Sequence, residues 1–399
     1  MPLAAQPPRN GHRALRTQVD GIQHHMTDTD APISQAERIT NLDTIRGFAT
    51  LGILVMNAIS FGLPQPAFFN LDYAGSDTWL DWTIGVAGEI FIDQKTMAMF
   101  SLLFGAGIVV FADRAEAKGR RTVRLSLWRN LLLLIIGLIH TAFWFGDVLT
   151  LYAICSPVLL VMRRRSARTL FITGGLCIAV SAVAMIIAQA AIEPSTDLGE
   201  YWVDENVAMS ATVGVAFVLD FGGRALGAML IGVGLFRAEI IQGLKPAAFY
   251  RCMAGIGFGV GLPLSVLGVV IHMTNDWSGD VSLIGAVPNI VATIPMALGY
   301  IAVITLWNQR STTRLHERFR AVGRMALTNY LTQTIIGLLV LDGLFSFDTL
   351  SRTQIVIFIV AVWVLQLSWS EPWLNRFRFG AFEWLWRVAT YRKLQPIRR

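Results

Sequence analysis

A histidine and an aspartate seven residues apart form the pair of side chains best suited to chemistry. His140 and Asp147 stand in the segment RNLLLLIIGLIHTAFWFGDVLTLYAI, the histidine near the end of an apolar run and the aspartate directly after Gly146. If the chain turns between them, the carboxylate can orient the imidazole, which is the arrangement that general-base catalysis uses. Asp147 is equally suited to capping the following helix, and His140 to donating a hydrogen bond to a backbone carbonyl. Both interpretations stay open.

Asp43 and Arg46 form a second pair, in the segment RITNLDTIRGFATLGILVMNAISF. Residues three apart share one face of a helix. Charges in the first turns of an apolar helix are costly unless they face protein or water. The pair is therefore either a clamp between helices or part of a path for a substrate.

Further charges lie inside or beside apolar runs. Asp220 and Arg224 are four apart and can neutralise each other, or they can line the path of a substrate or ion. Glu89, Asp93 and Lys95 precede the second apolar run. The presence of Lys95 beside an apolar run is explained if its ammonium extends to the lipid headgroups.

The C-terminal stretch RFRFGAFEWLWRVATYRKLQPIRR predicts an amphipathic helix. Trp386 lies on its apolar stripe, and Glu383 and Arg387 are spaced to pair on another face. A basic helix that carries tryptophan is typical of the membrane interface. We expect it either to form an inner-face lid that docks under the other helices or to rest passively at the interface.

The remaining candidate motifs indicate packing. Cys155, Cys177 and Cys252 each lie within an apolar run and lack the spacing of metal ligands, so we predict no disulfide, no metal site and no cofactor. Glycines at four-residue spacing in segments 212–236 and 248–272 predict close helix contacts, and no strand-turn-helix pattern accompanies them to form a phosphate loop.

The composition indicates which elements position these residues. Of 399 residues, 54% are hydrophobic and 15% are charged, a balance typical of a polytopic membrane protein and not of one soluble core. The net charge of +6 comes from Lys and Arg clusters between apolar runs, which indicates cytoplasmic loops and no nucleic-acid partner. We therefore expect an all-α transmembrane helical bundle in contact with the lipid bilayer. The sequence predicts no particular oligomeric state.

Ten apolar runs have about the length that a bilayer requires. They lie at residues 45–63, 97–113, 127–145, 147–163, 168–192, 212–236, 248–272, 281–307, 325–347 and 353–374. The eighth contains Pro288 and Pro295, either of which could interrupt it. Residues 79–96 predict an amphipathic helix at the outer face, which we do not count as a span.

The distribution of basic residues predicts the orientation. Basic segments follow the second, fourth, sixth, eighth and tenth runs, whereas residues 64–94 contain no Lys or Arg and residues 193–210 carry five acids. Because cytoplasmic loops retain Lys and Arg, both termini are predicted to be cytoplasmic, in the inner membrane.

Three regions follow from these patterns. Residues 1–37 predict a disordered cytoplasmic tail, in which Met26 could be the true start. Residues 38–375 form the predicted transmembrane helical domain. Residues 376–399 form the predicted cytoplasmic interfacial helix.

Four blocks of sequence carry a family resemblance. They are LDTIRGFATLGILVMN, SLLFGAGIVVFADRA, LLLLIIGLIHTAFWFGDVLTLYAI and GAFEWLWRVATYRKLQP. In this order they resemble the YeiB-like membrane proteins, the family called domain of unknown function 418. GRMALTNYLTQTIIG also looks like that family's penultimate helix.

The first block is also similar to the larger class of transmembrane acyltransferases. Members of that class carry an acid, an arginine three residues later, and often a catalytic histidine fourteen residues after the acid. Counted from Asp43, the last position is Asn57, and an amide cannot act as a base. The resemblance therefore implies acyl transfer only if His140 has taken over the role.

Three functions remain open. As an enzyme, the protein would use a cytoplasmic donor such as acyl-CoA to acylate an envelope glycan or lipid, with His140 as base and Arg46 and Asn57 along the donor path. As a transporter, it would bind a small solute, with Asp220 and Arg224 as coupling or gating groups. We find no inverted repeat, which many transporters have. A non-catalytic membrane partner needs only the packing features.

Overall fold

The secondary structure is helical throughout the described part of the chain. The computed structural model describes residues 39–119, 121–310, 312–345 and 347–399. Apart from one isolated bridge between Phe377 and Arg398, their regular structure consists of helices, which confirms the predicted all-α class. The predicted tail, residues 1–37, lies outside the described residues. The helices are α2 (Thr40–Gly62), α3 (Trp79–Phe91), α4 (Lys95–Ala117), α5 (Thr122–Thr141), α6 (Leu149–Met162), α7 (Ala167–Ala191), α8 (Pro194–Asp197), α9 (Ala211–Arg237), α10 (Ala247–Thr274), α11 (Val287–Arg310), α12 (Arg314–Arg324), α13 (Ala326–Gly337), α14 (Arg352–Arg376) and α15 (Ala381–Tyr391), with short helical turns at η2 (Gln65–Phe68), η3 (Gly199–Tyr201), η4 (Gly279–Val281) and η5 (Leu338–Asp342).

Most of these helices have the length and composition of membrane spans, as expected of a multi-pass membrane protein. Among the described residues, eight pass, with α3 and α4 counted together, or nine if α12 and the α13–η5 segment, bent by 80°, form one span. The predicted fourth span is α6, which has 14 residues and is therefore about 21 Å long, shorter than the roughly 30 Å hydrocarbon core. The ten predicted runs all correspond to helices, and ten crossings stay a prediction.

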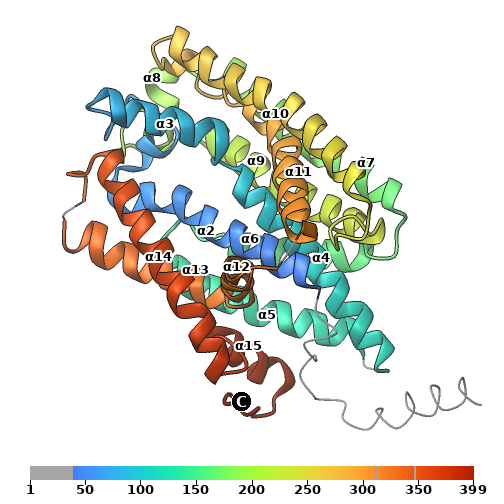
Figure 1. Cartoon of the computed structure of the whole chain (residues 1–399). Helices are drawn as coiled ribbons and strands as arrows, with labels where there is room; N and C mark the ends of the chain where they lie inside the picture. Colours follow the sequence, from blue (N-terminus) through green and yellow to red (C-terminus); the bar gives the residue numbers. More distant parts are fainter. Residues whose placement is uncertain (1–38, 120, 311, 346) are drawn as a thin grey trace, which may run out of the picture. The chain divides into compact units, whose positions relative to one another are not determined.

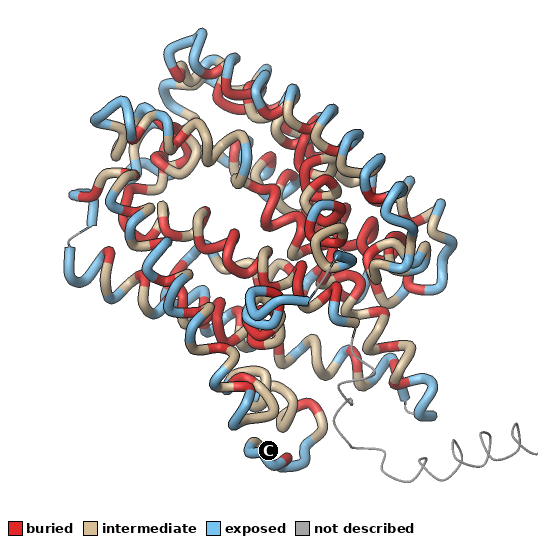
Figure 2. The backbone as a smooth tube through the Cα atoms, in the orientation of Figure 1, coloured by how far each residue is buried: buried red, intermediate tan, exposed pale blue. Residues whose placement is uncertain are grey.

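Helix α2 is the most enclosed of the spans. Its apolar window is 72% buried, against 22% for α5 and 28% for α7 and for α10. It packs against α4, α11, α12, α13 and α14 (Figures 1 and 2). The less buried helices present large apolar side chains outward, as contact with lipid requires.

Glycines allow two of the helix crossings to bring backbones together. A Cβ added at Gly47 of α2 would lie 2.1 Å from the carbonyl oxygen of Phe319 in α12, and one at Gly323 would lie 1.9 Å from that of Asp43. Gly105 of α4 meets α9 in the same way. Of the glycine contacts predicted in α9 and α10, those at Gly223, Gly227, Gly257 and Gly261 are present, whereas Gly255 and Gly259 meet no other described residue closely.

Helix α12 corrects the prediction of a basic loop after the eighth run. Its residues alternate basic and apolar with helical spacing, and Phe319 stacks on Phe48 of α2 at a ring separation of 3.9 Å. The chain bends by 80° after α12, and α13 starts beside it. Pro295 lies within α11 without ending it, and Pro288 lies in the first turn of that helix.

Candidate functional site

The hairpin between α5 and α6 brings His140 and Asp147 together. The imidazole Nδ1 lies 2.8 Å from Asp147 Oδ1, and the Thr150 backbone N–H donates to Asp147 Oδ2 at 2.8 Å. The carboxylate therefore orients the histidine and caps the first turn of α6 at the same time. The Asp147 side chain is fully buried, and that of His140 is 8% exposed.

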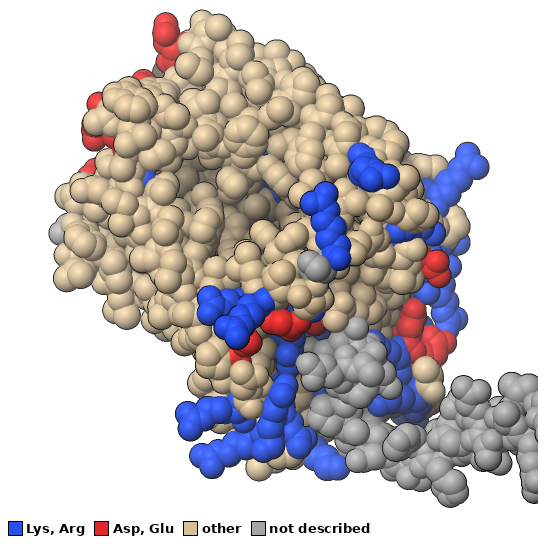
Figure 3. All heavy atoms as spheres, in the orientation of Figure 1, with Lys and Arg blue, Asp and Glu red and all other residues tan. Residues whose placement is uncertain are grey.

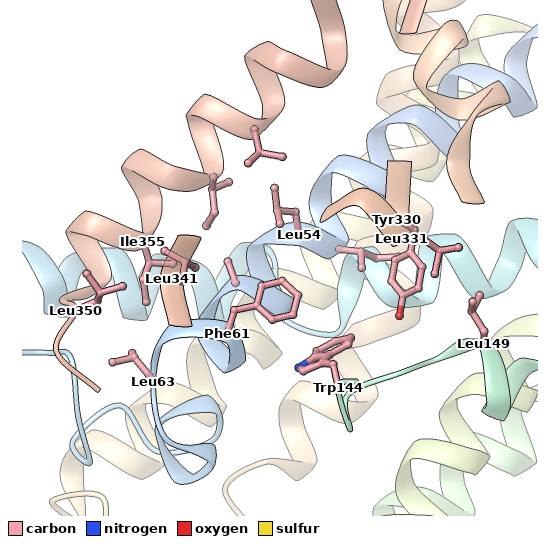
Figure 4. Packing of buried hydrophobic residues seen from close by; sticks show 14 of the residues in the cluster. Leu54, Phe61, Leu63, Trp144, Leu149, Tyr330, Leu331, Leu341, Leu350 and Ile355 are labelled. Carbon is pink, nitrogen blue, oxygen red and sulfur yellow. The ribbon is translucent and has the colours of Figure 1, made fainter. Parts of the chain in front are cut away.

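Aromatic residues from distant segments enclose this pair. Tyr330 of α13 donates its hydroxyl to Asp147 Oδ1 at 3.3 Å, and its ring lies 5.2 Å from the imidazole ring. The Trp144 ring lies 5.8 Å from the imidazole and 4.9 Å from Phe61. Figure 4 shows Tyr330 with its hydroxyl directed toward the chain that carries Trp144 and Leu149.

The second nitrogen of His140 is buried and has no hydrogen-bond partner among the described residues. In the tautomer that donates from Nδ1 to the Asp147 carboxylate, Nε2 presents a lone pair. The indole N–H of Trp144 is also without a partner in the described part of the chain. The geometry leaves His140 with an oriented base nitrogen that no described residue uses.

The polar residues of α2 include Asp43, Arg46 and Asn57. Arg46 donates to Asp43 Oδ1 at 3.1 Å, and the two side chains are 28% and 13% exposed. Asn57 is partly buried farther along α2, and no hydrogen bond joins Arg46 or Asn57 to the histidine pair in the described residues. Figure 3 shows a hollow in the face between α2 and α3.

Asp220 and Arg224 of α9 form a forked ion pair. Arg224 Nε donates to Asp220 Oδ1 at 2.8 Å, and its Nη2 donates to the other carboxylate oxygen. The residues are only 1% and 5% exposed, so the two charges compensate each other away from water. The predicted contact between them is thus present.

The same ion pair lines a cavity of about 60 Å³. Its walls come from the end of α3, from α7, α9, α10 and α11, from the turns η2 and η3, and from the residues on either side of η4. The polar lining residues are Glu89, Asp93, Gln94, Asp220, Arg224, Ser265, His272, Ser282 and Asn289, and the aromatic ones are Phe68, Phe69, Tyr201, Trp202, Phe221 and Trp277.

Lys95 does not snorkel, contrary to the expectation from sequence. It is 0% exposed, and its ammonium donates to the Glu89 carbonyl and to Asn289 Oδ1 of α11. Gln94 has a left-handed conformation (φ 60°) between α3 and α4. The chain thereby breaks between the two helices, and α4 begins with its lysine pointing inward.

The C-terminal helix α15 docks on other helices through Glu383 and Trp386, whereas Arg387 binds the segment that follows α15. The Glu383 carboxylate accepts hydrogen bonds from the backbone N–H groups of Leu327 and Thr328, at 2.7 and 3.0 Å, in the first turn of α13. Trp386 donates to the carbonyl of Arg129 at 3.1 Å, and Arg387 donates to Gln395 at 2.8 Å. Glu383 and Arg387 thus serve separate partners instead of the predicted pairing with each other.

Sequence reasoning missed several of these residues. Tyr330 carried no signal beyond an aromatic in an apolar helix. His272 lies at the end of an apolar run, with no acid or base at a spacing that would single it out, yet it stacks on Trp277 with ring centroids 5.0 Å apart and also faces Trp202 at 5.2 Å. Glu89 stood out only as a charge that precedes the second apolar run, and it lines the cavity.

Comparisons with known proteins identify the relatives of this chain. The profile of a family described as "Protein of unknown function (DUF418)" matches residues 235–393. The uncharacterized protein YeiB of Escherichia coli is 30% identical over an alignment of 388 residues that covers 90% of this chain and 98% of that protein. The uncharacterized protein YxaH of Bacillus subtilis is 30% identical over 92% of this chain and 97% of its own length. The chain therefore belongs to the DUF418 family of YeiB-like membrane proteins.

Proposed function

We propose that the protein is an acyltransferase of the inner membrane that uses His140 as its general base. One observation carries the proposal: the imidazole is held by Asp147 at 2.8 Å while its other nitrogen is buried with no partner in the described residues. A purely structural histidine in an apolar setting is expected to use both nitrogens, because an unpaired buried polar atom costs about 1–3 kcal/mol.

The residues suit an acyl-transfer reaction in which the donor and the acceptor of each proton can be named. The lone pair of His140 Nε2 accepts the proton of an acceptor hydroxyl or amine, and the acceptor atom attacks the carbonyl carbon of an acyl thioester. The new C–O or C–N bond forms as the C–S bond breaks, and the leaving thiolate takes the proton from Nε2–H. Asp147 stabilises the imidazolium between the two steps, and Tyr330 holds Asp147.

The donor in this proposal is acyl-CoA from the cytoplasm, and the acceptor is an envelope glycan or lipid. Arg46 and Asn57 of α2 line the donor path, beside the hollow described above. Because Nε2 is enclosed by Trp144 and Tyr330, the hairpin must open for substrate to reach it. No cofactor is required.

The test is transfer of labelled acetyl groups from acetyl-CoA to an envelope fraction by the purified protein in vesicles. We expect His140→Gln to lower transfer by about 10²-fold or more, the scale of general-base catalysis. Asp147→Asn should leave partial activity because the imidazole remains. Phe145→Ala is the matched control, because that side chain is 59% exposed on the same hairpin. Equal transfer by wild type and His140→Gln would refute the proposal.

A second candidate is transport of a small solute. The observation that favours it is the buried Asp220–Arg224 pair at the wall of a cavity, since ionised residues within membrane helices commonly mark solute and ion paths. Asp220→Asn should then abolish solute uptake into proteoliposomes while leaving acetyl transfer intact. Solute uptake that is unchanged in Asp220→Asn would count against transport.

A further inference from the structure

Three buried polar atoms at the cavity between α3, α9, α10 and α11 lack a hydrogen-bond partner. They are Gln94 Oε1, Ser265 Oγ and His272 Nδ1, unpaired within the described residues. The three residues are 4%, 1% and 7% exposed, and all line the same cavity. Buried polar groups are nearly always paired, so three unpaired atoms on residues that line one cavity indicate that a polar guest completes the site.

The charged groups of the cavity determine the sign of the charge that the guest carries. Arg224 is engaged by Asp220, and the Lys95 ammonium is engaged by two neutral oxygens. Asp93 accepts hydrogen bonds only from the amides of Gln94 and Asn289 in the described structure.

Glu89 is the one acid of the cavity whose carboxylate makes no hydrogen bond or ion pair with another described residue. The carboxyl groups of Glu89 and Asp93 both line the cavity, and the guanidinium of Arg224 in the same lining is engaged by Asp220. The described lining therefore offers an anionic guest no unengaged arginine or lysine, whereas its carboxyl oxygens can accept the N–H groups of a cation.

The apolar walls of the cavity are aromatic. Trp202 and Trp277 are stacked at 6.2 Å, and Phe69 stacks on Tyr201 at 4.6 Å. Aromatic faces attract cations, and the attraction strengthens when water is excluded. At about 60 Å³ the space suits a small head group and not a sugar chain.

We propose that this cavity binds a small organic cation, a primary or quaternary ammonium, with Glu89 as its counter-ion and with Trp202 and Trp277 as its aromatic wall. Gln94 Oε1 and Ser265 Oγ accept the N–H groups of a primary ammonium. The site concerns binding alone and does not depend on acyl transfer, because it shares no residue with the His140–Asp147 pair.

The test uses methylammonium and tetramethylammonium chloride as probes of the purified protein in detergent. Tryptophan fluorescence and thermal unfolding should both show saturable binding of at least one of them. Glu89→Gln preserves size and should weaken that binding by about tenfold or more, or about 1.4 kcal/mol. Trp277→Leu should weaken tetramethylammonium binding in particular, since cation–π attraction is the main term for that probe.

Control variants show whether the probes bind in this cavity or elsewhere on the protein. Glu193→Gln removes an exposed acid outside the cavity and should leave binding unchanged, as should His140→Gln. Sodium acetate tests whether the site binds an anion instead of a cation. Absence of binding by both ammonium probes, or equal binding by wild type and Glu89→Gln, would overturn the proposal, and neither result affects the acyl-transfer assay.

Discussion

At the scale of single residues, the Asp147 carboxylate holds both a helix turn and a histidine. Its two oxygens serve different partners, Oδ2 the first turn of α6 and Oδ1 the imidazole of His140 and the hydroxyl of Tyr330. A helix cap contributes about 1 kcal/mol. The capping and orienting interpretations of the sequence were therefore not alternatives.

Glu383 supplies a prediction about pH. Burial raises the pKa of its carboxyl above the ordinary value of 4.5, and the hydrogen bonds from Thr328 and Leu327 offset only part of that rise. The folded state then holds the proton more tightly than the unfolded state. The stability from this proton is complete below pH 4.5 and is lost as pH rises through the folded-state pKa.

The comparison is with Glu383→Gln, which keeps an acceptor for the amides of α13 but has no proton to lose. Each unit of pKa difference corresponds to about 1.4 kcal/mol, so the melting temperature of wild type relative to the variant should fall by a few degrees as pH rises above 4.5. Thermal unfolding in detergent from acid to neutral pH measures this. A difference in melting temperature between wild type and variant that is the same at every pH would contradict the raised pKa of Glu383.

At the scale of helices, two glycines of α4 provide a matched pair. A Cβ at Gly105 would lie 2.1 Å from the Met229 carbonyl oxygen of α9, and one at Gly107 would meet nothing within 4 Å. Gly105→Ala should cost about 1–3 kcal/mol, because a backbone atom must move. Gly107→Ala should be neutral or gain up to about 1 kcal/mol of helix propensity. Equal melting temperatures for the two variants would show that α4 and α9 do not cross this closely.

Apolar runs in the sequence predicted the helices well because each helix crosses or contacts an apolar environment along one continuous segment. They failed for α12, whose basic residues matched the pattern of a loop although its apolar face packs on α2. The α5–α6 hairpin could be predicted since a seven-residue separation limits where its ends can lie. The cavity could not, because Glu89, Asp220, His272 and Asn289 come from four separate helices and their convergence depends on tertiary packing.

At the scale of the whole molecule, charge divides the described surface. Lys and Arg gather toward one end in Figure 3, with some Asp and Glu among them, whereas the opposite end shows mainly Asp and Glu. Arg163 after α6 binds Glu116 at the end of α4, and Arg237 at the end of α9 binds the Arg163 carbonyl. The basic segments that follow α4, α6 and α9, which were predicted to lie on the cytoplasmic side, thus contact one another.

This arrangement predicts the position of the C-terminus. A phosphatase that is active only outside the cytoplasmic membrane, fused after Arg399, should remain inactive, because the basic end should stay cytoplasmic. The same reporter fused within the acid-rich segment 193–210 is the positive control. Activity of the C-terminal fusion would contradict the assigned orientation.

The bond between Glu383 and α13 has a consequence for the order of biosynthesis. The amides in the first turn of α13 receive their carboxylate from a residue 56 positions later in the chain. While a ribosome is still adding α14, those amides have no acceptor from α15, so the penultimate hairpin cannot reach its final state. A product truncated before residue 383 therefore lacks this acceptor, and we expect membrane proteases to degrade it faster than the full-length chain.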